Sequence, residues 1–268
     1  MLVVTLGDLL LDVIVQLHEA LATDADADAK TLTSPGGQAA NVAAWVVAVG
    51  GEARCVARRG DDPTGTALAA ELAARGVELV GPASGANGVV VSIVGPDGER
   101  TMASDRGTAT LLEPDDLDPA WFACDCLHIS GYALLASPID SAARRASELA
   151  RACGARVSVD LSAWTRIRAH GPERFRSELG ALAPDTVFGN EAEWGELGAV
   201  GATRVVKRGA SGFDVVRGNT SERCQARDVS VVDTTGAGDA LAAGFLVGGP
   251  ELALDAAARC IAKVGAMP

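Results

Sequence analysis

The sequence predicts a doubly wound α/β domain, in which helices flank a mostly parallel β-sheet, with a small β-sheet beside it. Short β-branched runs alternate with longer Ala-rich stretches, as in a parallel sheet covered by helices. The chain has 268 residues, 48% of them apolar, enough for a packed core. Because no linker interrupts it, we expect residues 1–268 to form one domain.

The strands of the main sheet are predicted from short runs rich in Val, Ile and Leu. They cover Leu2 to Leu6, Cys126 to Ile129, Arg156 to Val159, Thr186 to Phe188, Arg204 to Lys207 and Phe213 to Val216. The helices are predicted from Gln38 to Val49, Thr64 to Arg75, Ile139 to Cys153, Glu173 to Leu182, Gly238 to Val247 and Glu251 to Val264. Several of them end on glycine, which favours helix termination.

Two regions interrupt this alternation. One is Asp12 to Gln16, and the other is a predicted hairpin, with Gly88 to Val94 as one strand, Gly95 to Gly98 as the turn and Glu99 to Ser104 as the second strand. No helix of their own would cover these strands. We therefore expect segments at about 11–17, 30–35 and 87–106 to form a small sheet that closes over a cleft as a lid.

Charge and cysteine content exclude several function classes. The formal net charge is -12, and Lys and Arg do not cluster, which argues against nucleic acid as a partner. The six cysteines are scattered without metal or redox spacing, so we expect reduced thiols. The first residues, Met1 to Asp8, lack a basic flank and a long apolar run, so neither a signal peptide nor a membrane span is predicted, and we expect a cytoplasmic protein.

A glycine-rich run near the C-terminus predicts an anion site. Val229 to Val232 is predicted as a strand, Asp233 to Gly238 as a tight turn and Asp239 to Val247 as a helix. Bare glycine backbone and a helix N-terminus together suit a phosphate. A carboxylate there would repel that phosphate unless it serves as a base, which is the role we assign to Asp239. The alternative is a tight turn with a helix cap, and a dinucleotide loop fits less well because the third glycine is missing.

A second constellation opens the first long helix. Gly36 and Gly37 offer backbone for close approach, and Asn41 projects from the first helical turn. An amide side chain beside bare backbone provides the paired donors and acceptors that a polyol needs. The alternative is a Pro-Gly-Gly turn with a solvated asparagine.

Together the two runs resemble the two sequence signatures of the PfkB family of carbohydrate kinases. The first has Gly36, Gly37 and Asn41, and the second has the whole of residues 233–239. The resemblance implies a ribokinase-like fold and ATP-dependent transfer of a phosphoryl group to a hydroxymethyl group of a sugar or sugar derivative. Asp239 would be the catalytic base, with the N–H groups of Gly236, Ala237 and Gly238 holding the transferred charge. A nucleoside kinase of the same fold, a non-catalytic sugar- or nucleotide-binding relative and a dinucleotide-dependent oxidoreductase are the alternatives.

The resemblance also implies the acceptor side of the site. In the family an aspartate follows the glycine of the first strand by five residues and binds substrate hydroxyls, and Asp12 follows Gly7 in that way. The substrate-binding residues would be Asp12, Gly36, Gly37 and Asn41, joined by Arg106 from the lid. Arg106 would contact an acidic or phosphorylated substrate, or else lie solvated.

On the nucleotide side, the run from Asn190 to Glu193 resembles the family's Asn-x-x-Glu motif, whose glutamate organises Mg²⁺ through water. The nucleotide-binding residues implied are Asn190, Lys207, Gly209, Gly212, Gly236 and Gly238. Lys207 would either reach a phosphate or lie along the strand edge. Asp233 and Thr235 match positions of a monovalent-cation site, for which K⁺ is the expected ion.

The sequence departs from the family pattern at three positions. Gln38 stands where ribokinases tend to carry lysine, and Ser162 and Trp164 stand where many sugar kinases carry Asn and Arg. These departures leave the acceptor open. Family members often dimerise through the lid sheet, and the apolar strand from Val89 to Val94 permits a homodimer here.

Overall fold

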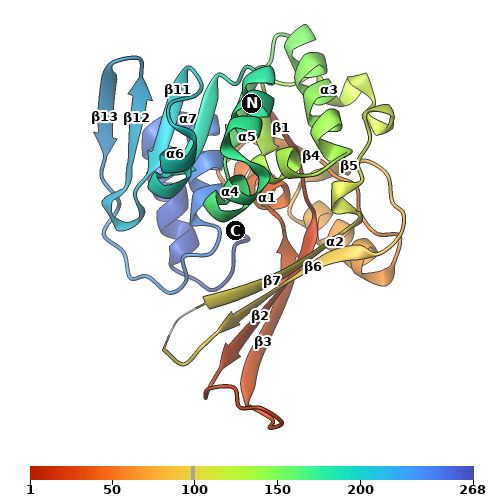
Figure 1. The fold of residues 1–268 in the computed structure, drawn as a ribbon, viewed down its shortest axis with the longest axis vertical. Coiled ribbons are helices and arrows are strands. Elements are labelled where there is room, and N and C mark those ends of the chain that lie inside the picture. Colours follow the sequence, from red (N-terminus) through yellow and green to blue (C-terminus); the bar gives the residue numbers. More distant parts are fainter. Residues whose placement is uncertain (98–99) are drawn as a thin grey trace.

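The computed structural model describes residues 1–97 and 100–268, and in it a large sheet forms the body of the protein (Figure 1). Its nine strands are ordered β13 (Thr220–Cys224), β12 (Phe213–Arg217), β11 (Thr203–Lys207), β10 (Thr186–Asn190), β9 (Arg156–Asp160), β8 (Cys126–Ser130), β1 (Leu2–Leu6), β4 (Glu52–Val56) and β5 (Glu78–Val80). Strands β11 to β5 pair in parallel, and β12 and β13 add an antiparallel edge. The predicted doubly wound, mostly parallel sheet is confirmed.

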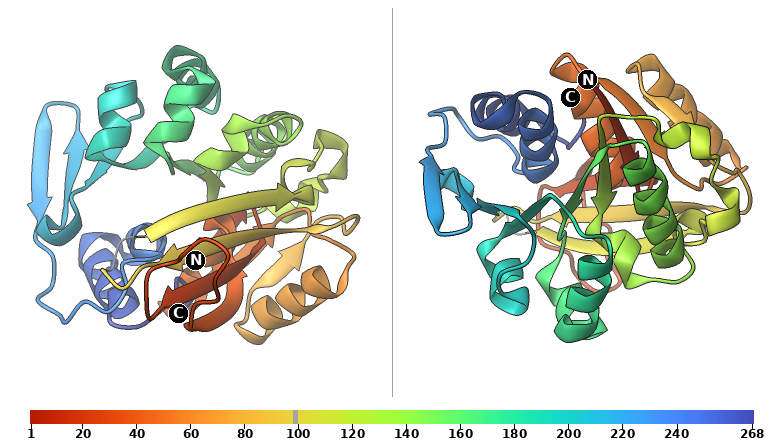
Figure 2. Two further views of the ribbon diagram at one scale, coloured as in Figure 1. Left: turned by 60° about the horizontal axis from the view of Figure 1, so that its bottom comes forward. Right: turned by 90° about the horizontal axis from the view of Figure 1, so that it is seen from above.

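Helices cover both faces of this sheet, as the view from above shows (Figure 2). One face packs against α1 (Gln38–Ala48), α2 (Pro63–Ala74) and α7 (Ala237–Ile261), and the other against α3 (Ile139–Ala152), α4 (Trp164–His170), α5 (Pro172–Ala181) and α6 (Glu191–Leu197). Short 3-10 helices lie at Thr108–Thr110, Pro114–Asp116, Pro119–Phe122, Gly131–Leu135 and Gly209–Ser211. Each face has its own apolar core, with Trp45 and Phe188 in one and Phe122 and Phe175 in the other.

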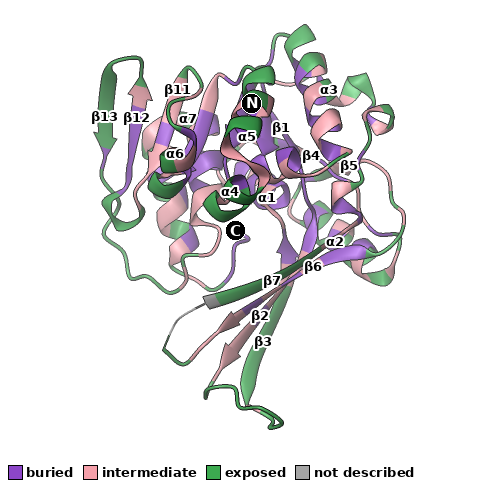
Figure 3. Ribbon diagram, in the orientation of Figure 1, coloured by how far each residue is buried: buried purple, intermediate pink, exposed green. Residues whose placement is uncertain are grey.

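A separate four-stranded sheet projects from the body (Figures 1 and 3). Its strands are ordered β3 (Ala29–Gly36), β2 (Leu10–Leu17), β6 (Asn87–Val94) and β7 (Arg100–Gly107). The two central strands, β2 and β6, pair in parallel, and the outer strands pair antiparallel. Part of the predicted turn and the predicted start of the second hairpin strand, at residues 98–99, lie outside the described residues.

The prediction of a strand from Val229 to Val232 is wrong. Among the described residues this segment pairs with no strand and has no regular structure, with a bend at Val232, whose N–H donates to the carbonyl of Ile261 at the end of α7. The hairpin of β12 and β13 already closes this edge of the sheet, so the segment crosses over the helix instead. Its valines stay exposed, Val231 by 60% and Val232 by 57%.

The last two predicted helices form one element, α7, with a kink. Gly249 has φ 79° and ψ −162°, and Pro250 follows it, so the helical hydrogen bonds break there. By length and composition α7 is apolar enough to cross a membrane, yet half of the residues in its most apolar stretch are buried inside the protein. Its contacts with α1 in the core account for that composition.

Candidate active site

The glycine-rich loop forms the N-terminus of α7. Gly236 caps the helix with φ 78°, a left-handed conformation that glycine adopts readily. A Cβ added at Gly236 would also lie 2.6 Å from Cα of Ala266, so a side chain has no room. In this conformation the N–H of Ala237 donates to the carbonyl of Thr234 over 3.2 Å, and a phosphate would have to share or replace that bond.

The residues that follow α7 hold this loop in place. The carboxylate of Asp233 accepts hydrogen bonds from the N–H and hydroxyl of Thr235 at 2.9 and 2.7 Å, and from the N–H of Gly265 at 2.9 Å. Nε1 of Trp45 donates to the carbonyl of Ala266 over 2.7 Å. Helices α1 and α7 therefore fix the loop together.

Asp239 lies in the first turn of α7 and contacts the second constellation. Nδ2 of Asn41 donates to Oδ2 of Asp239 over 2.7 Å, joining residues 198 positions apart in the sequence. The pKa of Asp239 is raised to about 7, mainly by burial and also by Asp160 and Asp12, against the opposing effects of Asn41 and Lys207. A carboxylate with a pKa near neutrality suits a general base.

Lys207, at the end of β11, forms an ion pair with Asp160, at the end of β9. Its Nζ lies 2.9 and 2.8 Å from the two carboxylate oxygens of Asp160, which is fully buried. Burial alone would lower the pKa of Lys207, but Asp160 and Glu193 outweigh it, so the pKa is raised and the ammonium stays charged. A Cβ at Gly238 would lie 3.2 Å from this Nζ, so the charge sits directly beside the loop.

The Asn-x-x-Glu run starts α6 as a capping box. Asn190 accepts from the N–H of Glu193 at 3.0 Å, and the Glu193 carboxylate accepts from the N–H and Nδ2 of Asn190 at 2.7 and 2.9 Å. Glu193 is 2% exposed, and burial raises its pKa, against the opposing effect of Lys207. The run is therefore not a solvated helix start, and it places a carboxylate near Lys207.

On the acceptor side, the side chain of Asp12 on β2 lies against Gly36 on β3, two residues beyond its paired residue Ser34. A Cβ at Gly36 would lie 2.1 Å from Cγ of Asp12, so glycine is required for the aspartate to occupy this position. Gly37 is similarly close to the loop that follows β1, because its Cβ would lie 2.4 Å from the carbonyl oxygen of Asp8. The glycines thus bring Asp12 and Asn41 to the same end of the sheet.

Arg106 is neither solvated nor free for an anion. It forms an ion pair with the buried Asp8, and its guanidinium lies 3.7 Å from the ring centroid of Tyr132. The expected contact with an acidic substrate would require this pair to open.

Two of the three departures from the family pattern contact each other. Oγ of Ser162 lies 2.7 Å from Oε1 of Gln38, within hydrogen-bond distance. Trp164 is exposed, and the guanidinium of Arg168 lies 4.8 Å from its ring centroid.

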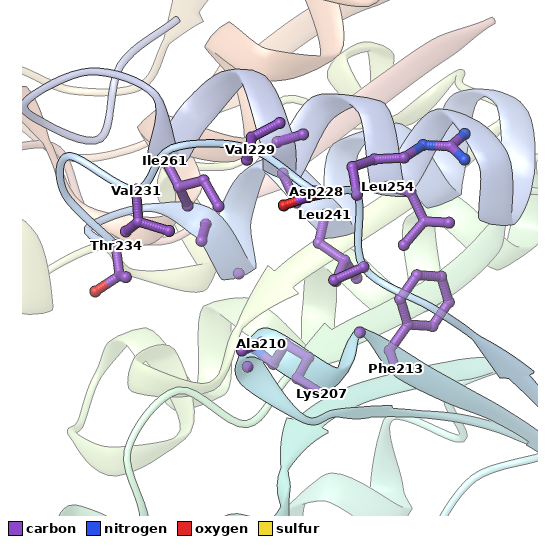
Figure 4. Close-up of a pocket in the computed structure, with 18 residues that line it drawn as sticks. Lys207, Ala210, Phe213, Asp228, Val229, Val231, Thr234, Leu241, Leu254 and Ile261 are labelled. Carbon is purple, nitrogen blue, oxygen red and sulfur yellow. The ribbon is translucent and has the colours of Figure 1, made fainter.

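A cavity of about 520 Å³ opens beside the loop (Figure 4). Its polar end has Lys207, Gly209, Gly212, Ala237 and Gly238. The opposite wall is mostly apolar, with Val229, Val231, Leu241, Leu254 and Ile261 beside the polar Asp228 and Thr234. Four of the six predicted nucleotide-binding residues, Lys207, Gly209, Gly212 and Gly238, line this cavity, whereas Asn190 and Gly236 do not.

No role in the site was predicted for three residues of this region, which are Asp8, Tyr132 and Asp160. Asp8 and Asp160 each lie at the carboxyl end of a parallel strand, where ligands bind in doubly wound sheets, so their position was a usable signal. Tyr132 follows β8 inside a 3-10 helix and carries no comparable signal.

Comparison with known proteins identifies the family. The model of the pfkB family carbohydrate kinases matches residues 1–266. The chain is 33% identical over 249 residues to a fructokinase of Klebsiella pneumoniae, covering 83% of this chain and 79% of the relative. It is 29% identical over 278 residues to an ATP-dependent ribose-1-phosphate kinase of Halopiger xanaduensis, covering 96% and 90%.

Among solved structures, the adenosine kinase from Sinorhizobium meliloti superposes with a TM-score of 0.89 at 25% identity, covering 99% of this chain and 95% of that one. The ribokinase-like fold expected from the sequence is therefore confirmed. The chain belongs to the pfkB family of carbohydrate kinases, which are phosphotransferases.

Proposed function

We propose that this protein transfers the γ-phosphoryl group of ATP to a hydroxymethyl group of a sugar or sugar derivative. The observation that carries the proposal is Asp239, a carboxylate with a pKa of about 7 beside an anion loop that opens into a cavity of about 520 Å³. A relative that covers nearly the whole chain is named as ATP-dependent, which supports ATP as the donor.

In the reaction, the carboxylate of Asp239 takes the proton of the acceptor hydroxyl. The acceptor oxygen forms a bond to the γ-phosphorus while the bond from that phosphorus to the β–γ bridging oxygen breaks, and ADP leaves with the electron pair. The N–H groups of Gly236, Ala237 and Gly238, at the positive end of α7, and the ammonium of Lys207 stabilise the charge of the transferred group.

The apolar wall of the cavity fits a nucleotide base, with its phosphates directed toward Gly209, Gly212 and Lys207. Glu193 is the proposed residue for Mg²⁺ held through water, because its buried carboxylate near Lys207 provides the oxygen atoms that suit this ion. When bound, Mg²⁺ would neutralise charge on the nucleotide phosphates.

Asp233 and Thr235 are the proposed ligands of K⁺, but the fit is poor, because the Asp233 carboxylate already accepts three hydrogen bonds from the protein. Whether activity depends on K⁺ is tested by replacing KCl with choline chloride at constant ionic strength, and equal rates of ADP release in the two salts would exclude a K⁺ requirement.

The four-stranded sheet is the proposed lid, because it carries Asp12 and Arg106. Its exposed Leu32 and Met102 are compatible with the proposed homodimer through this sheet, for which sedimentation equilibrium is the test.

The base assignment is tested with Asp239→Asn, which keeps an acceptor for the Asn41 amide but removes the base. We expect kcat to fall by a factor of about 10² to 10⁴ in an ADP-release assay with pentoses, hexoses, sugar acids and nucleosides. An equal rate in the variant would show that Asp239 is not the base. Turnover only with nucleosides would favour the second candidate, a nucleoside kinase, which the similarity to the adenosine kinase supports. A protein that binds these ligands without turnover would be a non-catalytic relative.

A further inference from the structure

Three groups near the anion loop offer oxygen atoms of the kind that bind a monovalent cation. They are the carboxylate of Asp233, the carbonyl of Thr235 and the carbonyl of Ala266, which lies in the segment after α7. A Cβ added at Gly236 would lie 2.6 Å from Cα of Ala266, so this segment packs directly against the turn that caps α7. Carbonyl oxygens can replace the water around such an ion, but only where they point at it. The partners of these oxygen atoms therefore decide whether a cation fits.

Donors of the protein occupy the carboxylate of Asp233 and the carbonyl of Ala266. Nε1 of Trp45 donates to the Ala266 carbonyl over 2.7 Å. The N–H of Gly265 donates to Oδ2 of Asp233 over 2.9 Å, and the N–H and hydroxyl of Thr235 donate to Oδ1 over 2.9 and 2.7 Å. A cation would have to displace some of these hydrogen bonds before it could bind.

The carbonyl of Thr235 is covered by a buried thiol. Sγ of Cys260 lies 3.3 Å from the Thr235 carbonyl and 3.9 Å from the Ala266 carbonyl. The pKa of Cys260 is raised to about 12, mainly by burial, so the thiol stays protonated and its one proton bonds one carbonyl at a time. A cation shared by these two carbonyls would compete with the sulfur atom for both of them.

Two positive charges lie close to the same place. The guanidinium of Arg259 lies 5.4 Å from the centroid of the Trp45 ring, and the ammonium of Lys263 lies 5.8 Å from it. Lys263 also lowers the pKa of Cys260, against the larger effect of burial, so its charge acts on that thiol. A monovalent cation at the Ala266 carbonyl would add a third positive charge, and like charges repel each other strongly where water is excluded.

We propose that Trp45, Cys260 and Gly265 hold the anion loop in place of a monovalent cation, so that phosphoryl transfer requires neither K⁺ nor another ion of that kind. The inference rests on the proposed function of the site, and it reverses the expectation of K⁺ that the resemblance implied. Trp45 and Cys260 are positioning residues, because they contact the loop and the segment beside it rather than the reacting atoms. Their hydrogen bonds connect the core between α1 and α7 to the turn whose N–H groups receive the transferred charge.

The first experiment measures whether the parent protein responds to the ion. ADP release and thermal unfolding are compared in KCl and in choline chloride at equal ionic strength, with ATP as its Tris salt so that no other Na⁺ or K⁺ enters. We expect kcat and KM for ATP to agree within about twofold and the Tm within about 1 °C. A kcat about fivefold higher in KCl, or a Tm about 2 °C higher, would overturn the inference. The Tm requires no turnover, so it decides this point even if every acceptor fails and the proposed function is wrong.

The second experiment removes the donors. Trp45→Phe/Cys260→Ala keeps an aromatic ring but removes both side-chain donors, which leaves two carbonyls able to bind an ion. We expect kcat in choline chloride to fall about fivefold, and KCl to raise it again by about threefold and the Tm by about 2 °C. Trp121→Phe/Cys153→Ala makes the same two substitutions on the other face of the sheet, and it should behave as the parent does in both salts.

Single variants of Cys260 decide the matter if the double variant fails to fold. Cys260→Ser retains a donor for the Thr235 carbonyl and should stay independent of K⁺, whereas Cys260→Ala should gain an activation by K⁺ of about twofold. A decrease in kcat that is equal in the two salts would show that these donors have only a structural role, and it would overturn the inference. An unchanged kcat in Cys260→Ala and in the folded double variant would overturn it as well.

Discussion

Replacing Asn41 with alanine should move the acid limb of the pH–rate profile to higher pH. The amide of Asn41 donates to Asp239 over 2.7 Å and lowers its pKa, against the burial that raises it to about 7. The base is active when deprotonated, so kcat/KM rises as the pH passes through that pKa. Without the Asn41 donor the carboxylate loses stabilisation relative to the acid, and the pKa of Asp239 rises further.

The size of the shift follows from the hydrogen bond. A hydrogen bond to a charged group contributes about 1.5–3 kcal/mol. The protonated form of Asp239 also accepts a weaker hydrogen bond from the Asn41 amide, so the carboxylate is favoured over the acid by roughly half of that energy. About 1.4 kcal/mol corresponds to about one pH unit. At pH 7 the deprotonated fraction of Asp239 would then fall from about one half to about one tenth, and kcat/KM would fall about fivefold from this cause alone.

The assay is kcat/KM measured by ADP release from about pH 5.5 to 9.5, a range that brackets both midpoints. Asn41 is also a proposed binding residue for the acceptor substrate. A decrease in kcat/KM that is the same at every pH therefore reports weaker acceptor binding, and only the midpoint of the acid limb reports the pKa of Asp239. Asn219→Ala, in the exposed turn after β12, should leave the profile unchanged. A midpoint in Asn41→Ala equal to or below that of the parent would refute the proposed coupling of Asn41 to the base.

Three further outcomes follow from the site. Asp239→Asn should raise the Tm by a few degrees at pH 8 and leave it unchanged near pH 4. The pKa of Asp239 is higher in the folded protein than in the unfolded chain, so at a pH above both values the ionised carboxylate destabilises the fold, by at most about 4 kcal/mol. A Tm lowered at pH 8 would contradict this. Lys207→Met leaves Asp160 buried and unpaired, which should cost about 3–5 kcal/mol in thermal unfolding and raise KM for ATP, whereas adding Asp160→Leu should restore stability alone. Restored ATP affinity in that double variant would exclude a phosphate contact by Lys207. Gly36→Ala should displace Asp12 and raise acceptor KM about tenfold or more, with KM for ATP unchanged in the same assay; equal effects on both would indicate misfolding instead.

Six of the nine strands of the large sheet, and the longer helices, could be predicted because their apolar pattern is local, whereas the short strands β4 and β5 and the short helices α4 and α6 were not predicted. The run from Val229 to Val232 has the same β-branched composition, yet it is exposed and unpaired, since whether a sheet edge is open depends on strands elsewhere. Conversely, β13 (Thr220–Cys224) is polar and was not predicted, because an edge strand pairs through its backbone and needs no apolar side chains.

The site divides in the same way. Asp239 and Asn41 lie in motifs with a recognisable spacing, so each could be predicted, although the hydrogen bond between them could not. Arg106 was expected to be either a substrate contact or solvated, and its ion pair with Asp8 depends on a contact across 98 residues of sequence. Hydrogen bonds and ion pairs between residues so far apart in the sequence depend on how the two sheets pack, which local composition does not predict.

The small sheet is attached to the body at four points, which constrains how it can move. The chain passes between the two sheets from β1 to β2, from β3 to α1, from β5 to β6 and from β7 toward β8, and Gly37 alone separates β3 from α1 (Figure 1). Three of these connections have one to six residues, whereas the chain from β7 to β8 passes through residues 108–125. We expect a sheet held at four points to tilt as one piece rather than to swing on a single hinge. Asp12 on β2 and Arg106 on β7 would therefore shift together, so that any tilt re-aims both side chains in a single step.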